Sequence, residues 1–83
     1  MTTENTNAAI IERCETDLII YAGRVNQCAD EGDHNRNRVN YGIARHSAAM
    51  LDYLNQTVRL CEYEDDGFLR ISMVRINDRV VDF

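Results

Sequence analysis

The sequence Asp30-Glu31-Gly32-Asp33 separates two stretches of helical periodicity, and it decides the fold that we expect. Gly32 suits the left-handed backbone that commonly follows the last turn of a helix. Asp33 suits the N-cap of a following helix, because its carboxylate can accept a hydrogen bond from a free backbone N–H. A connection this short predicts that the two helices are antiparallel neighbours and form a helical hairpin.

Before this turn, apolar residues recur at alternating steps of three and four, as they do on one face of a helix. They are Ile11, Cys14, Leu18, Tyr21, Val25 and Cys28. We expect a first helix over residues 7–30, capped by Asn5 or Thr6, after a frayed polar lead at residues 1–6. The cysteines of this face are expected to be reduced and to act as small core residues.

After the turn, a second apolar stripe has the same helical spacing. It contains Val39, Ile43, Ser47, Met50, Leu51, Leu54, Val58 and Cys61. The stripe predicts a second helix over residues 34–61. A strand over residues 57–64 is the alternative, because this segment contains β-favouring residues. Its acidic residues would also lie unfavourably at the C-terminus of a helix.

The last part of the chain, residues 68–83, predicts a short β-hairpin that turns at Asn77-Asp78. Partial alternation places Leu69, Ile71 and Met73 on one side of its first strand. The fold class that we expect is therefore mainly α, with an antiparallel two-helix hairpin followed by a C-terminal β-hairpin. With 83 residues, the chain is expected to form a single domain.

Charge and hydropathy exclude several classes of function. The formal net charge is −5, which argues against direct binding to nucleic acid or to an anionic membrane. No apolar stretch is long enough to span a bilayer. The polar start, Met1-Thr2-Thr3-Glu4-Asn5, does not resemble a signal peptide. We therefore expect a cytoplasmic protein.

Motifs for catalysis are absent from the sequence. There is no nucleophile elbow, no phosphate-binding loop and no Cys-x-x-Cys pair. His34 and His46 are twelve residues apart, which is about 18 Å along a helix and too far for a shared metal ion. We predict that the protein is not an enzyme and that it has no catalytic residues, metal or cofactor.

One locally basic segment, His34–His46, contains three arginines and no acidic residue. Arginine with an interleaved tyrosine can hold a phosphate and stack on a base, or pair with acidic side chains of a protein. The segment also begins at a helix N-terminus, which favours anions. Its candidate binding residues, which we call the arginine strip, are Arg36, Arg38, Tyr41 and Arg45. The alternative is an ordinary solvated helix face.

Two further groups are candidate contacts. The acidic residues Glu62, Glu64, Asp65 and Asp66 can imitate phosphates in the basic site of a nucleic-acid-handling protein partner. Ile19 and Ile20 lie off the core face of the first helix, and Ile20 points nearly opposite to it. A second apolar stripe on a chain this small indicates self-association, so we expect a homo-oligomer with Ile19 and Ile20 at its interface.

These features predict a non-catalytic binding protein that docks on a larger protein complex as an inhibitor or regulator. In size, charge and composition, the chain resembles the small acidic phage proteins that act against bacterial defence, such as anti-CRISPR proteins. The resemblance implies protein binding in the cytoplasm of a bacterial host, and it assigns no role to any residue. The alternative is an oligomeric sponge, similar in kind to phage nucleotide sponges, in which the arginine strip sequesters a phosphorylated small molecule or nucleotide.

Overall fold

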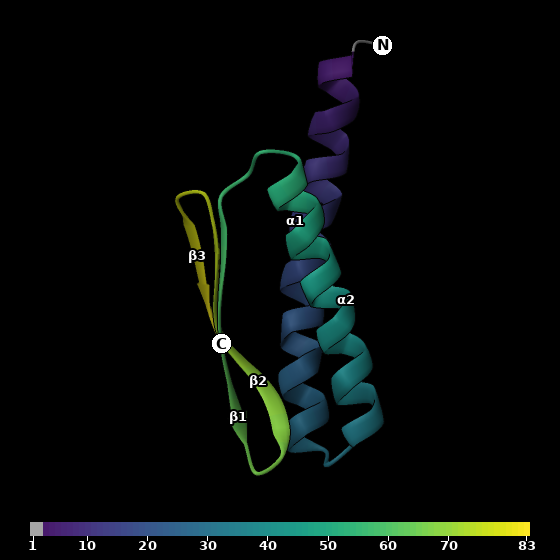
Figure 1. Cartoon of the computed structure of the whole chain (residues 1–83), viewed down its shortest axis with the longest axis vertical. Helices are drawn as coiled ribbons and strands as arrows, with labels where there is room; N and C mark the ends of the chain where they lie inside the picture. Colours follow the sequence, from purple (N-terminus) through teal and green to yellow (C-terminus); the bar gives the residue numbers. More distant parts are fainter. Residues whose placement is uncertain (1–2) are drawn as a thin grey trace.

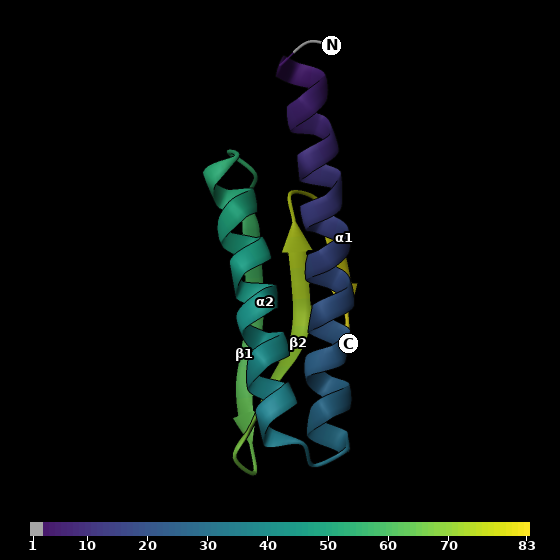
Figure 2. The same ribbon diagram turned by 90° about the vertical axis from the view of Figure 1, so that its right-hand side faces the viewer.

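The computed structural model describes residues 3–83, with side chains from residue 7 onward. A helical layer covers one face of a β-sheet, and the other face of the sheet has no covering element among these residues (Figure 1). The elements, in chain order, are α1 (Thr3–Asp30), α2 (His34–Tyr53), β1 (Val58–Asp65), β2 (Phe68–Ile76) and β3 (Arg79–Asp82). Figure 2 shows α2 in front of β1, with β2 between the two helices.

The connection between the helices has the predicted geometry. Gly32 has a left-handed backbone (φ 73°), and the N–H of Asp33 donates to the carbonyl of Cys28 at 3.0 Å. These features define a Schellman C-cap for α1. The carboxylate of Asp33 then accepts a hydrogen bond from the backbone N–H of Arg36 at 3.1 Å, which caps α2. The chain therefore reverses here, and α2 runs back along α1 (Figures 1 and 2).

The predicted core face of α1 is confirmed, since Leu18, Val25 and Cys28 are buried. The start of the helix was predicted wrongly. α1 begins at Thr3 rather than at residue 7, so the predicted caps lie inside the helix. The polar residues of its first turns include no Pro or Gly that would disfavour a helix there. Residues 1 and 2 of the predicted lead lie outside the described residues. The first turns of α1 extend beyond the end of α2 (Figure 1).

The prediction of a second helix over residues 34–61 is wrong at its C-terminal end, and the strand alternative is correct. α2 ends at Tyr53, and Asn55 takes a left-handed backbone (φ 64°) that a helix cannot continue through. The β-favouring residues that follow form β1, which pairs with β2. Pairing along the whole of β1 stabilises the strand over a helical extension.

The buried face of α2 agrees only in part with the predicted stripe, of which Ser47 and Leu51 are buried. Val39 is 61% exposed and Ile43 is also exposed, although both were predicted to lie in the core. The residues that α2 buries are Asn37, Asn40, Ala44, Ser47 and Leu51. Most of them are small or carry amides, which allows close packing against α1 and provides hydrogen bonds to the sheet. The helix is therefore rotated away from its most apolar side.

The sheet has three antiparallel strands in the order β1-β2-β3, rather than the two that were predicted. Between β1 and β2 the register shifts next to Cys61, where Ser72 is an extra residue on β2. This β-bulge changes the alternation of β2, so that Ile71 and Val74 both face the helices and are buried. Met73, predicted on the same side as Ile71, instead lies on the opposite face of the sheet.

Both turns of the sheet use left-handed residues. Asp66 (φ 53°) and Gly67 (φ 83°) connect β1 to β2, a pair typical of a two-residue hairpin turn. Asn77 (φ 53°) connects β2 to β3, so the predicted Asn77-Asp78 turn is confirmed. The side chain of Asn77 also accepts a hydrogen bond from the N–H of Thr57 at 3.0 Å, which ties this turn to the start of β1.

Two buried or half-buried amides attach the helices to the sheet. Asn37 of α2 donates to the carbonyl of Leu69 at 2.9 Å and accepts from its N–H at 3.0 Å. Asn26 of α1 makes the same pair of hydrogen bonds with Ile71, at 2.8 and 2.9 Å. Because β3 is shorter than β2, these amides satisfy the part of the β2 edge that no strand covers.

The core lies between the two helices and β2. Its fully buried side chains come from all three elements, and both halves of the helical hairpin contribute. The largest of them are Leu18, Leu51, Ile71, Val25, Val74 and Asn37. Burial of aliphatic side chains at this interface supplies the main stabilisation of the fold, at about 1.5–3 kcal/mol for each fully buried Leu, Ile or Val.

Candidate functional site

Two acidic segments that are far apart in the sequence lie at the same end of the molecule. The connection between α1 and α2 and the turn between β1 and β2 are neighbours there in both views (Figures 1 and 2). All the acidic residues that we group here are exposed. We call them the acidic pole: Asp30, Glu31, Glu64, Asp65 and Asp66. The fold thus gathers carboxylates at one end of the molecule.

Arg70 and an aromatic stack hold the two segments together. Nη2 of Arg70 donates to Oδ1 of Asp30 at 2.8 Å, and its Nε lies 3.4 Å from Oδ2 of Asp65. The hydrogen bond with Asp30 raises the pKa of Arg70, so the guanidinium stays charged. The rings of His34 and Phe68 stack with centroids 3.9 Å apart and planes inclined by 10°. The helical turn and the β-turn therefore have a fixed mutual arrangement.

The acidic pole has an excess of negative charge. Within the described residues, Arg70 is the one cation that forms ion pairs with it. Glu31, Glu64 and Asp66 make no ion pair there. Repulsion among carboxylates that the fold holds close together is tolerated because each of them is solvated. The pole can therefore offer a preformed negative surface to a cationic partner.

The predicted acidic cluster is divided by the structure. Glu64, Asp65 and Asp66 lie in the acidic pole, whereas Glu62 faces α2, where Nη1 of Arg45 lies 3.5 Å from its Oε1. From the sequence, Asp30 and Glu31 were predicted only as part of the turn between the helices, not as contact residues. The Asp66-Gly67 pair, a strong hairpin signal, could have indicated that the acidic end of β1 returns toward the helical connection.

The arginine strip does not form one continuous surface. Tyr41 is half-buried and packs against the core, and Arg45 pairs with Glu62. Arg38 is exposed to solvent. Arg36 lies on the other side of α2, where it lines a pocket next to α1. The strip and the acidic cluster, predicted as separate sites, thus meet at Arg45 and Glu62.

Burial raises the pKa of Tyr41, and its hydrogen bond and charge interaction with Glu62 raise it further, while Arg45 lowers it. We expect the phenol to lose its proton at a higher pH than an ordinary tyrosine, whose pKa is 10.0. Because the pKa of Tyr41 is higher in the folded state, protonation of its phenol stabilises the folded protein. This contribution to the free energy of unfolding is complete below the unfolded-state pKa, and it is lost as the pH rises through the folded-state pKa.

The raised pKa of Tyr41 can be measured by ultraviolet titration. The titration of the wild type minus that of Tyr41→Phe should have its midpoint above pH 10. A midpoint at or below pH 10 would contradict this assignment.

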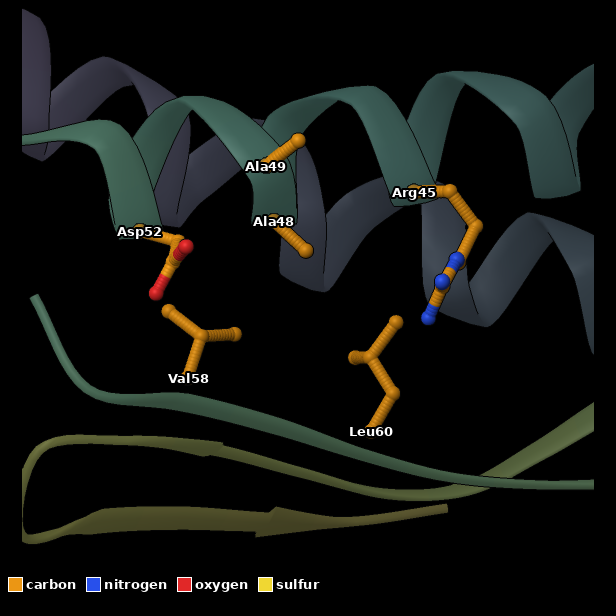
Figure 3. Close-up of a pocket in the computed structure, with 6 residues that line it drawn as sticks. All are labelled: Arg45, Ala48, Ala49, Asp52, Val58 and Leu60. Carbon is orange, nitrogen blue, oxygen red and sulfur yellow. The ribbon is translucent and has the colours of Figure 1, made fainter.

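A groove of about 310 Å³ lies between α2 and β1 (Figure 3). Arg45 stands at one end and Asp52 at the other, and short alanine side chains lie between them. The groove is lined by Arg45, Ala48, Ala49, Asp52, Val58 and Leu60. Its floor is apolar and its two ends carry opposite charges.

A second pocket, also of about 310 Å³, lies between α1 and α2. It carries two arginines, of which Arg24 also lies over the ring of Tyr21 at 4.9 Å from the centroid. The pocket is lined by Arg24, Gln27, Cys28, Glu31, Arg36 and Asn40. This set of donors is suited to an anion, although Glu31 brings one negative charge to the rim.

The predicted interface residues on α1 have different surroundings. Ile19 is half-buried and packs against the core, which accounts for its apolar side chain. Ile20 is 44% exposed. The role of Ile20 in an oligomer interface stays a prediction.

Among the side chains of residues 7–83, no three His, Cys, Asp or Glu come together in a way that could hold a metal ion. Cys14, Cys28 and Cys61 are free thiols. Neither α1 nor α2, over the part that the structure describes, has the length and apolar character needed to cross a membrane.

No protein-family model matches the chain, and neither a curated protein nor a solved structure does. The class that the fold defines is a two-layer α+β domain, in which a helical hairpin covers one face of an antiparallel three-stranded sheet.

Proposed function

We propose that the protein is a non-catalytic binding protein that docks on a larger protein through its acidic pole, as a small inhibitor or regulator. The observation that carries this proposal is the convergence of two acidic segments at one end of the fold, held by Arg70 between Asp30 and Asp65. The resemblance in size and charge to phage anti-defence proteins agrees with this role and adds no residue assignment.

The chemistry of the acidic pole defines the kind of partner. A preformed array of carboxylates fits a surface rich in arginine and lysine, such as the site where a protein holds nucleic acid phosphates. Charges of opposite sign speed the encounter and exclude wrong partners, and their effect weakens as salt screens them. The pole therefore acts in place of phosphates and blocks the partner's nucleic acid site.

The proposal predicts a selective loss of binding when the acidic pole is neutralised. The variant Glu31→Gln, Glu64→Gln, Asp66→Asn removes three charges and keeps both ion pairs of Arg70. A matched control, Glu12→Gln, Asp78→Asn, Asp82→Asn, removes three exposed charges elsewhere. Affinity capture from a bacterial lysate, quantified by mass spectrometry, should recover a basic partner with the wild type and the control, and at least about tenfold less of it with the pole variant. Equal recovery by all three would contradict the proposal.

Sequestration of a phosphorylated small molecule is the second candidate, and the pocket that contains Arg24 and Arg36 favours it. Calorimetry with mono-, di- and cyclic nucleotides tests it. Arg36→Ala should abolish the binding heat, whereas Arg38→Ala, on the other side of α2, should leave it unchanged. Absence of heat with the wild type would remove this candidate.

A further inference from the structure

No strand among the described residues pairs with the outer edge of β1. β1 is an outer strand of the sheet, and the N–H of Asn77 donates to the carbonyl of Thr57, so the backbone groups of residue 57 face β2. By the alternation of an antiparallel ladder, the backbone groups of Val58, Leu60 and Glu62 face away from β2. The uncovered edge of β2 is satisfied by Asn26 and Asn37, whereas no side chain among the described residues does this for β1.

The groove above this edge has a weakly paired charge at one end and, within the described residues, an unpaired charge at the other. The side chain of Arg45 is 54% exposed, and its ion pair with Glu62 is a single contact of 3.5 Å. Asp52, at the other end, makes no ion pair within the described residues. Between them, Ala48 and Ala49 leave room for another element (Figure 3).

This arrangement is complementary to itself. When a second copy lies antiparallel across a two-fold axis near Ala48 and Ala49, Arg45 of each copy meets Asp52 of the other. The strand edge supplies the second element, because the outward backbone groups of Val58, Leu60 and Glu62 can pair with those of an identical strand. The occupant that fits the charges of the groove and the open edge of β1 at once is another copy of this chain.

We propose that two copies of the protein pair through their β1 edges, so that their two sheets become one continuous sheet and their α2 helices meet above the seam. In the register that fits the groove, Leu60 of one copy lies opposite Leu60 of the other. The neighbouring register would place Arg59 opposite Arg59, which like-charge repulsion disfavours. The outward backbone groups of Val58, Leu60 and Glu62 then have hydrogen-bond partners.

The dimer leaves the proposed binding surface free. β1 runs toward the acidic pole, and antiparallel pairing therefore directs the two poles to opposite ends of the assembly. One dimer thus presents two separate poles. The inference does not depend on the proposed function, because it rests on the strand edge and the groove alone.

Light scattering over a range of concentrations tests the dimer through a charge exchange. The wild type should have a molar mass approaching twice 9.6 kDa. Asp52→Arg alone and Arg45→Asp alone each place like charges together at both ends of the seam, and each should raise the dimer dissociation constant at least about tenfold. An equimolar mixture of the two variants restores both pairs of unlike charges, so it should recover the dimer mass.

Three control measurements make the outcome decisive. Circular dichroism establishes that each variant is folded. Glu12→Arg changes the charge of an exposed site on α1 by the same amount as Asp52→Arg and should leave the dimer intact. Ile20→Asp should also leave it intact. A wild type that stays monomeric, a mixture that fails to recover the dimer, or dissociation by Ile20→Asp but not by Asp52→Arg would overturn the proposal.

Discussion

Replacement of Asn37 by alanine is expected to lower the free energy of unfolding by about 3 kcal/mol, because it leaves buried backbone groups without hydrogen-bond partners. The Asn37 amide donates to the carbonyls of Val25 and Leu69 and accepts from the N–H of Leu69. The side chain is 1% exposed, so water cannot readily replace it. One amide thus links α1, α2 and β2.

Urea denaturation measures this loss, with Asn35→Ala as the matched control. Asn35 lies two residues away on the same helix and is exposed, so its replacement should change stability by less than about 0.5 kcal/mol. If Asn37→Ala cost no more than Asn35→Ala, the amide would not hold β2 to the helices.

Replacement of Ile71 by alanine is expected to lower the free energy of unfolding by about 2–5 kcal/mol, because it leaves a cavity in the core between the helices and β2. Ile71 is 1% exposed and belongs to the core cluster. The backbone of residue 71 keeps its pairing with the Asn26 amide, so the loss reports the side chain alone. Thermal unfolding followed by circular dichroism should therefore show a transition at a much lower temperature.

The control is Ser72→Ala, which keeps the length of β2 and removes one hydrogen bond, from the hydroxyl to the carbonyl of Cys61 at 3.1 Å. It should cost about 1 kcal/mol or less. Similar transitions for Ile71→Ala and Ser72→Ala would show that the buried side chain of Ile71 does not stabilise the core.

Local chemistry made the helical hairpin predictable. Gly32 and Asp33 act through their own backbone and side chain, and their partners lie within a few residues. The core face of α1 followed from aliphatic periodicity, because its buried residues are apolar. The end of α2 was harder to place, since the β-favouring segment after it becomes a strand only by pairing with β2.

The buried face of α2 could be predicted only in part from periodicity, which identified Ser47 and Leu51 but not the buried asparagines. Asn37 is in the core because its partner is Leu69, on a strand that the sequence does not place beside it. The bulge at Ser72 likewise interrupts the alternation that would identify the inner face of β2. Two of the five residues of the acidic pole, Asp30 and Glu31, were missed for the same reason, because Asp30 meets Asp65 only through Arg70 in the folded chain.

Amide hydrogen exchange on the complex with the captured protein tests the proposed function most directly. Residues whose amides are covered by the partner exchange more slowly than in the free chain. We predict that slowing concentrates at residues 30–33 and 64–67, the two turns of the acidic pole. Slowing confined to the exposed face of α1 or to the sheet face that the helices leave open, with both turns unchanged, would contradict a binding role for the pole.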